Sequence, residues 1–191
     1  MNKTKIEYAD YYRGYLAGMT DGDGTFKMPV PGRRYRHSQW YWRVALRDEF
    51  ILKRLRQVIR RLGIRIPIRE FSVPGMVKLE TRRATLLKKI YDAIYFKPIT
   101  ASYEVGYLAG IFDAEGNWHK SNLRIYNSKK EIRKRIMRYG YNLGFTFSDE
   151  EYKSEKWVGA VRLVGDRYEK IKFLASIRSA KSKTYLRVEG R

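Results

Sequence analysis

Two acidic pairs with the same spacing stand in the two halves of the chain. Asp21 and Asp23 are separated by one glycine and followed by another. Asp113 and Glu115 are separated by one alanine and are also followed by a glycine. Carboxylate oxygens are preferred ligands of hard divalent cations, and such a cation can activate water and stabilise developing charge in phosphodiester hydrolysis. The spacing therefore predicts a paired acidic site that holds metal.

Each acidic pair ends a longer segment that occurs twice. Residues 14–24 recur 92 residues later as residues 106–116, and seven of the eleven positions are identical. The apolar pattern predicts a helix over residues 10–21 with Asp10 as its N-cap. Glycines four apart allow two helix backbones to approach closely. We therefore expect the two repeated helices to pack on each other and to bring their acidic ends together.

The charge at these helix ends favours a bound cation. A helix C-terminus carries partial negative charge, so a carboxylate there is unfavourable, and two carboxylates brought together repel each other. The first acids, Asp21 and Asp113, are interpreted as structural, because an Asp at a helix end commonly binds nearby backbone amides. An EF-hand interpretation of residues 21–32 fails, because Phe26 and Gly32 stand where that loop needs Gly and Glu.

The composition of the chain points to a polyanionic partner. The 191 residues include 41 Lys and Arg against 20 Asp and Glu, a net charge of +21. This exceeds what solubility needs and predicts nucleic-acid binding. The absence of Cys and the presence of only two His exclude disulfides and thiolate or His-rich metal sites. With no signal peptide and no membrane span, we expect an intracellular, cytoplasmic protein that is nucleoid-associated when bound to DNA.

The order of predicted elements repeats after each acidic helix. In the first copy we expect strands at 25–28 and 38–46, a helix at 48–62, strands at 65–73 and 76–80, and a helix at 82–95. The second copy has a helix from 128, strands at 145–147 and 157–164, and a helix at 166–176. Eleven extra residues in the first copy are assigned to the loop at 32–39. The pattern predicts an α+β fold of two pseudo-symmetric α-β-β-α-β-β-α repeats, residues 1–97 and 98–191, in one compact body.

Alternation along the strands predicts one buried and one polar face for each sheet. We assign Phe26, Trp40, Trp42 and Trp118 to the core. The opposite face is suited to phosphates and base edges. The residues predicted to contact DNA are Thr25, Lys27, Arg33, Arg34, Arg36, Gln39, Tyr41, Arg43, Arg65, Arg69 and Lys78 in the first repeat, and Lys120, Asn122, Arg124, Tyr126 and Arg162 in the second.

Residues 16–24 and 108–116 resemble the motif of the LAGLIDADG homing endonucleases. Each segment matches six of the nine family letters and keeps the first acid and the final glycine. Two motifs in one chain resemble the monomeric two-repeat type, and the resemblance covers nearly the whole chain. It implies two saddle-shaped antiparallel sheets along the major groove of a long double-stranded DNA target, with the motif helices packed between them.

The resemblance also implies an activity and a metal site. It implies a monomeric, Mg²⁺-dependent endonuclease that cuts both strands of a specific site to leave short 3′ overhangs and is encoded by an intron or a similar mobile element. Mn²⁺ is expected to substitute, and Ca²⁺ is expected to bind without supporting cleavage. The implied ligands are the carboxylates of Asp23 and Glu115 and the carbonyls of Gly22 and Ala114.

Three further catalytic residues follow from the resemblance. A lysine just past the last helix of each unit is expected near the cleaved phosphate. This position corresponds to Lys97 in the first unit and to Lys181 or Lys183 in the second, of which we favour Lys183. Asn127 fits a polar position that helps to orient water, whereas the aligned residue in the first unit is Leu46. This departure predicts an asymmetric active site.

Two alternative functions remain open from the sequence. One is an RNA-binding intron maturase of the same fold, with intron RNA as its partner. The other is a basic nucleic-acid-binding protein of ribosomal type that has no catalytic activity. The second alternative accounts for the charge, but it gives no reason for two matched acids at matched helix ends.

Overall fold

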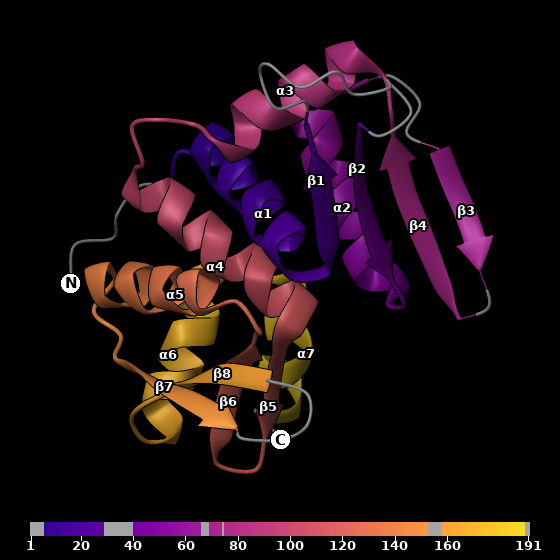
Figure 1. Cartoon of the computed structure of the whole chain (residues 1–191). Coiled ribbons are helices and arrows are strands. Elements are labelled where there is room, and N and C mark those ends of the chain that lie inside the picture. The colour runs from indigo at the N-terminus through magenta and orange to yellow at the C-terminus, as the bar shows by residue number, and fades with distance from the viewer. Residues whose placement is uncertain (1–5, 29–39, 66–68, 74, 153–157, 190–191) are drawn as a thin grey trace.

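The computed structural model shows two units whose first seven elements follow the same order, and the second unit ends with one further helix (Figure 1). It describes residues 6–28, 40–65, 69–73, 75–152 and 158–189, with the backbone alone at 69–73, 152, 158 and 187–189. The first unit comprises α1 (Tyr8–Asp23), β1 (Gly24–Lys27), β2 (Tyr41–Leu46), α2 (Glu49–Arg61), β3 (Arg69–Val73), β4 (Met76–Thr81) and α3 (Ala84–Ile94). The second comprises α4 (Ala101–Glu115), β5 (Gly116–His119), β6 (Asn122–Tyr126), α5 (Lys130–Asn142), β7 (Phe147–Tyr152), β8 (Val158–Leu163), α6 (Arg167–Ile177) and α7 (Ala180–Glu189).

Each unit contains one antiparallel sheet of four strands. The strand orders are β1-β2-β4-β3 and β5-β6-β8-β7, so the two sheets have the same topology. The predicted α+β class with two antiparallel sheets is therefore confirmed. The predicted division at residues 97 and 98 falls between α3 and α4 and stays a prediction. Among the described helices, none is long and apolar enough to cross a membrane.

The two units differ in length at the first hairpin. Thirteen residues join β1 to β2, whereas two residues join β5 to β6. This difference accounts for the eleven extra residues of the first repeat. Residues 29–39, to which the insertion and four of the predicted DNA contacts belong, lie outside the described part of the chain.

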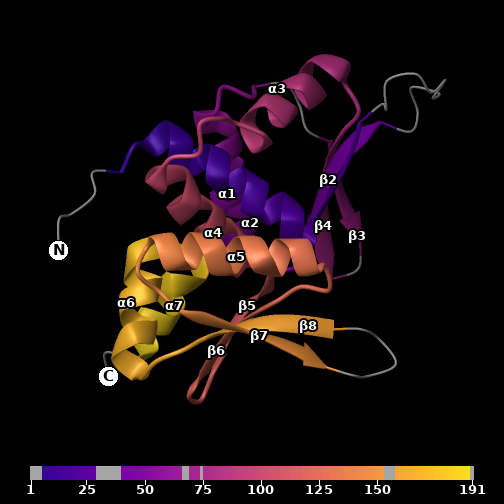
Figure 2. The ribbon, with the colours of Figure 1, turned by 60° about the vertical axis from the view of Figure 1, so that its left-hand side comes forward.

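The repeated helices α1 and α4 lie side by side in the middle of the molecule (Figures 1 and 2). A Cβ on Gly14 would lie 2.0 Å from the carbonyl oxygen of Tyr103, and one on Gly106 would lie 2.0 Å from the carbonyl oxygen of Tyr11. Any side chain at these two positions would force the helices apart. The contacts advance together along both helices, so α1 and α4 run parallel and end at the same place.

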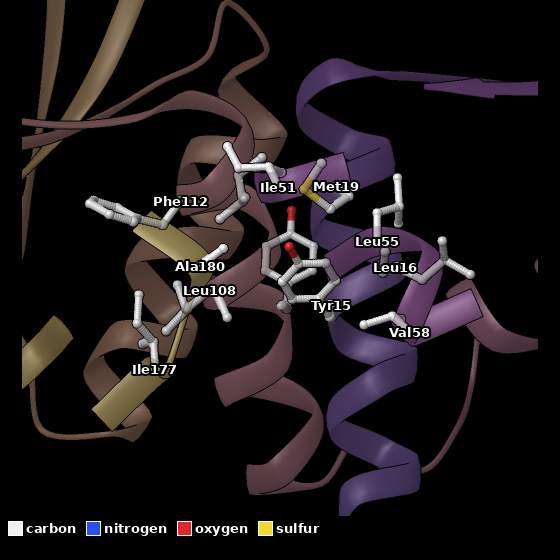
Figure 3. Packing of buried hydrophobic residues seen from close by; sticks show 14 of the residues in the cluster. Tyr15, Leu16, Met19, Ile51, Leu55, Val58, Leu108, Phe112, Ile177 and Ala180 are labelled. Carbon is white, nitrogen blue, oxygen red and sulfur yellow. The ribbon is translucent and has the colours of Figure 1, made fainter. Parts of the chain in front are cut away.

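Residues from both units form one hydrophobic core. Figure 3 shows buried residues of α1, α2, α4, α6 and α7 gathered around Tyr15. The predicted core residues Trp42 and Trp118 are buried, while Phe26 and Trp40 are half-buried and packed against the core. The core therefore holds the two acidic helix ends in one rigid frame.

Two predictions about helix ends were wrong or incomplete. Asp10 is not an N-cap, because α1 begins two residues earlier, with Glu7 at the N-cap position. Asp10 is instead buried in the first turn, where it pairs with Arg13 at 2.8 Å and accepts a hydrogen bond from the Thr100 hydroxyl at 2.9 Å. Helix α7 was not predicted; it begins after Arg178, whose backbone is left-handed.

Candidate active site

The acidic ends of α1 and α4 meet in the structure. Asp23 is the last residue of α1, and Glu115 is the last residue of α4. A Cβ on Gly22 would lie 2.5 Å from the Cβ of Ala114 and 3.1 Å from the Cγ of Glu115. Glycine at position 22 therefore allows the two helix ends to touch. The juxtaposition that the duplication predicted is present.

The local environment disfavours the negative charge on both acids. Crowding by protein atoms raises the pKa of Asp23 to about 6, although the side chain keeps access to solvent, and the Lys181 ammonium acts in the opposite direction. Burial also raises the pKa of Glu115, the charge of Asp23 raises it further, and Lys181 again lowers it. A divalent cation would favour ionisation of both carboxylates.

The first acid of the second motif anchors the start of α7. Asp113 is 1% exposed. Its carboxylate accepts hydrogen bonds from the backbone N–H groups of Ala180 and Lys181, each at 2.8 Å, and from the Tyr15 hydroxyl at 2.7 Å. Burial raises the pKa of Asp113, while these donors oppose that effect. The structural interpretation of Asp113 fits this set of contacts.

The first acid of the first motif has different partners. Asp21 accepts a hydrogen bond from the Tyr107 hydroxyl at 2.7 Å and pairs with the Arg135 guanidinium at 2.5 Å. Tyr107 and Tyr15 occupy equivalent positions of the two motifs, so each tyrosine binds the first acid of the other motif. These two tyrosines were not among the predicted site residues. Their position inside the repeated segment was the available signal.

Of the candidate lysines, Lys181 is the one that the fold brings to the acids. Its Nζ donates to the carbonyl oxygens of Gly116 at 3.0 Å and Ala114 at 3.4 Å. Lys183, the favoured residue, is exposed on α7. Burial lowers the pKa of Lys181, and the charges of Asp113, Asp23 and Glu115 oppose that effect. Lys181 therefore replaces Lys183 as the candidate in the second unit.

The structure does not bring Lys97 to the acids. Its neighbour Phe96 stacks on Tyr103 in the first turn of α4, and Thr100 caps that helix. Glu115 lies at the other end of α4, about 20 Å further along a helix that rises 1.5 Å per residue. The segment after α3 leads directly into the start of α4, which is why an active-site lysine at this position is not supported.

Asn127, the polar residue predicted to orient water, lies beside the end of α1. Its side-chain N–H donates to the carbonyl oxygen of Asp21 at 3.3 Å. A cavity of about 220 Å³ is lined by Asp21, Gly22, Glu115, Tyr126, Asn127, Ser128 and Lys129. The aligned Leu46 is buried in the first unit. The cavity therefore has two acidic residues, the helix-end Gly22, the amide residue Asn127 and the basic residue Lys129 in its lining.

The donor set suits a hard cation with an incomplete protein shell. Asp23 and Glu115 supply carboxylates at two helix ends, and the carbonyls of Gly22 and Ala114 lie in the same turns. No cluster of three or more His, Asp or Glu side chains occurs among the residues that the structure describes. Mg²⁺ commonly binds one or two carboxylates and completes its octahedral shell with water and substrate phosphates. The residues present fit this pattern.

Ion pairs organise the polar faces of the two sheets. In the first sheet Glu80 binds Arg43 and Arg82 at 2.5 and 2.7 Å. Burial acts to raise the pKa of Glu80, but the hydrogen bonds from the two arginines outweigh it and lower the pKa. In the second sheet Glu150 likewise binds Arg124 at 2.8 Å and Arg162 at 2.6 Å. In each sheet one glutamate therefore binds two arginines: Glu80 lies on the inner strand β4 and Glu150 on the edge strand β7.

The remaining predicted DNA contacts are distributed as follows. Thr25, Lys27, Arg65 and Lys120 are exposed, and Tyr41, Lys78, Asn122 and Tyr126 are half-buried. A cavity of about 520 Å³ includes Lys120, Asn122 and Arg162 in its lining. Arg69 belongs to β3, but its side chain is outside the described part, as are residues Arg33, Arg34, Arg36 and Gln39.

Comparisons with known proteins identify the fold. Residues 102–178 match the family model of the LAGLIDADG-like domain. The crystal structure of I-DmoI in complex with DNA and Ca superposes with a TM-score of 0.70 at 21% identity, covering 90% of this chain and 91% of that one. An I-DmoI variant with its target DNA and 2 mM Mg gives 0.71 at 20% identity, with coverage of 91% and 98%.

The same fold also occurs in the N-terminal LAGLIDADG domain of DUF199/WhiA. That domain gives a TM-score of 0.64 at 13% identity and covers 92% of this chain and 84% of its own. No curated protein matches the chain by sequence. Residues 102–178, which lie in the second unit, are therefore similar to the LAGLIDADG-like domain. The chain as a whole has the two-repeat LAGLIDADG fold that is seen in the homing endonuclease I-DmoI.

Proposed function

We propose that the protein is a site-specific DNA endonuclease of the homing type. The observation that carries this proposal is the meeting of Asp23 and Glu115 at the ends of two packed helices in a chain of net charge +21. A structural role does not account for two carboxylates brought together with raised pKa values. A metal-dependent cleavage site does, because the cation offsets their repulsion.

Double-stranded DNA is the proposed substrate. The two sheets present arginines held by Glu80 and Glu150, which is the chemistry that binds phosphates and guanine edges. The complex of I-DmoI with DNA supports the same partner for this fold. We propose a monomer that uses one unit for each half of a long target, cuts both strands to leave short 3′ overhangs, and is encoded by an intron.

Asp23, Glu115 and the adjoining carbonyls are the proposed metal ligands. A bound Mg²⁺ or Mn²⁺ would supply a Lewis acid for the scissile phosphate and a more acidic water. Ca²⁺ is proposed to bind without supporting cleavage. Lys181, whose ammonium lies at the same helix end, would stabilise charge on the phosphate, and Asn127 would orient water from the cavity beside Glu115.

A DNA-binding function without cleavage is the second candidate. The same fold occurs in the N-terminal LAGLIDADG domain of DUF199/WhiA, and one fold can carry different activities, so the fold alone does not decide the activity. If this candidate is correct, replacing both Asp23 and Glu115 leaves every activity of the protein unchanged. An RNA-binding maturase requires preferential binding of structured intron RNA over duplex DNA.

A selection on a random duplex library tests the proposal. The protein is first bound to the library in Ca²⁺, and cleaved products are then released with Mg²⁺. The wild type is expected to yield one long shared site that is cut on both strands. The matched control is the Asp23→Asn, Glu115→Gln double variant, which should bind the same site without cutting it. Cutting by the control, or binding without a shared site, would contradict the proposal.

A further inference from the structure

Two neighbouring tyrosines near the end of α3 are exposed to solvent. Tyr91 is 43% exposed and Tyr95 is 57% exposed, and their ring centroids are 4.6 Å apart. Phe26 of β1 lies beside both, with its ring centroid 6.2 Å from that of Tyr91 and 6.4 Å from that of Tyr95. A single exposed aromatic residue needs no explanation, but three adjoining rings form an apolar surface of the kind that binds a partner. These three residues are called the α3 aromatic surface.

The equivalent residues of the second unit are covered by the chain itself. Phe26 and Trp118 are the third residues of β1 and β5, and Tyr91 and Leu174 each lie seven residues after the start of α3 and α6. Trp118 and Leu174 are buried, and Tyr185 of α7 packs on Trp118. Helix α7 also packs on α6, and the first unit has no counterpart of α7 among the residues that the structure describes. The first unit therefore keeps large aromatic side chains at a place that its own helices leave exposed.

The protein surface around these rings is basic. Every charged residue from position 82 to position 97 is exposed, and five of the six are basic: Arg82, Arg83, Lys88, Lys89 and Lys97, with Asp92 as the one acid. Asp92 pairs with Lys88 at 3.2 Å. Lys88 lies three residues before Tyr91 and seven before Tyr95, so the three side chains share one face of α3. Exposed rings among cations are the combination that binds the bases and phosphates of an unpaired strand.

Helix α3 lies on the helical side of the first sheet, away from the polar face. It packs on β2 and α1, and its Leu86 and Ile90 are buried in the core that also contains Trp42 of β2. Arg43, the next residue of β2, belongs to the opposite face, because side chains alternate along a strand. Figure 2 shows α1 and α3 together on one side of that sheet. Duplex DNA on the polar face therefore does not cover the α3 aromatic surface.

We propose that the α3 aromatic surface is a second nucleic-acid site, which binds one unpaired strand. Tyr91 and Tyr95 stack on bases of the strand, and Lys88, Lys89 and Lys97 contact its phosphates. Every base has a face that can stack on an aromatic ring, so the site binds without a strong sequence preference. Stacking and charge do not distinguish ribose from deoxyribose, so DNA and RNA strands bind alike. This site is separate from the acids and acts without cleavage.

Fluorescence anisotropy of a labelled single strand tests this inference on the full chain. The probe is a short oligonucleotide of mixed sequence, made once as DNA and once as RNA, and excess unlabelled duplex DNA without complementarity to it occupies the sheets. The wild type is expected to bind both strands with affinities within about threefold of each other. The Tyr91→Ala, Tyr95→Ala double variant should bind each strand at least about tenfold more weakly, because base stacking is lost. Its affinity for labelled duplex DNA should change by less than about threefold, since duplex contacts belong to the sheets.

Matched variants separate stacking from general effects on the protein. Tyr91→Phe, Tyr95→Phe keeps both rings and should bind the single strand as the wild type does. Tyr141→Ala, Tyr168→Ala removes two tyrosines that are 77% and 69% exposed on α5 and α6, and it should also leave binding unchanged.

Three results would overturn the inference. They are no single-strand binding by the wild type in the presence of duplex, equal weakening by the two alanine pairs, and a preference of tenfold or more for one sugar, which would show that the site reads the 2′-OH. None of these results bears on cleavage of duplex DNA, so the proposed endonuclease is tested separately by the library selection.

Discussion

The two repeats hold the same acidic helix in different ways. In the first, Asp21 is bound by Tyr107 and by Arg135 from α5. In the second, Asp113 is bound by Tyr15 and by two backbone N–H groups at the start of α7. The tyrosines obey the twofold relation between the motifs, and the remaining partners do not.

The cause of this difference is the route of the chain after the last strand of each unit. After α3 the chain runs through residues 95–100 directly into the first turn of α4. After α6 it turns at Arg178 and enters α7, which packs against α2 and α4. An element outside the repeat thus delivers Lys181 to one side of a duplicated site. A duplicated sequence does not guarantee two equivalent half-sites.

The largest expected effect comes from the acids that the two repeats share. Asp23→Asn or Glu115→Gln should reduce double-strand cleavage by at least about 10³-fold, because several kcal/mol of metal-dependent stabilisation would be lost. DNA affinity, measured by gel shift in Ca²⁺, should change by less than about threefold, since the sheets supply most contacts. Normal cleavage with weakened binding would contradict the assignment.

Substitution of the candidate lysines tests whether the two repeats contribute equally to cleavage. Lys181→Met should slow cleavage by about 10²-fold, as expected for loss of a preorganised charge near the phosphate. Lys97→Met should change it by less than about threefold, because Lys97 lies near the other end of α4. Single-turnover rates on the selected target provide the measurement, with Lys183→Met as the control on α7. Equal reductions of the cleavage rate by Lys97→Met and Lys181→Met would show that the two lysines have equivalent roles.

The first acids should differ in their effect on stability. Asp113→Asn should lower the free energy of unfolding by about 2–4 kcal/mol, because a buried acceptor of several hydrogen bonds is replaced by a group that carries competing donors. Asp21→Asn should cost about 1 kcal/mol, since this ion pair is partly exposed. Urea unfolding of the two variants measures the difference. If Asp21→Asn loses more unfolding free energy than Asp113→Asn, the hydrogen bonds between Asp113 and the start of α7 contribute little to stability.

The sheets provide the matched test of DNA recognition. Arg43→Ala and Arg124→Ala should each relax preference at one base position, by about 1–3 kcal/mol of discrimination. The two positions should lie in opposite halves of the target, because the arginines belong to different sheets. Binding to a panel of singly substituted targets gives the result. A uniform loss across the panel would identify these arginines as phosphate contacts.

The smallest effect concerns the pH dependence of the metal-free protein. Because the pKa of Asp23 is raised to about 6 from an ordinary value near 4, its ionisation destabilises the fold as pH rises through that interval. Asp23→Asn should therefore be more stable than wild type above pH ~6, with the gain lost toward pH ~4. Solvent access limits the gain to less than about 1 kcal/mol. Thermal unfolding in EDTA across this pH range checks the sign.

Most of the fold could be predicted from local patterns. The glycines four apart and the repeated acids predicted two packed helices, and the alternation of residues in the strands predicted which side chains are buried. Trp42 and Trp118 are buried as a result. These features follow from periodicity and steric size, which are properties of short segments.

The active-site lysine and the partners of Asp21 and Asp113 could not be predicted from local patterns. Lys181 and Lys183 are two residues apart and chemically identical, so only the anchoring of α7 on Asp113 distinguishes them. Arg135 lies 114 residues from Asp21 in a chain with 41 Lys and Arg, and no local signal selects it.

The order of residues along the chain is enough to predict two acidic helices, their close contact and a strongly basic protein. These properties depend on residue size, spacing and charge. Folding in three dimensions sets which cation and which hydrogen-bond donors surround each acid. Those choices depend on where α5 and α7 pack, and packing joins residues whose separation in sequence carries no information about their distance in space.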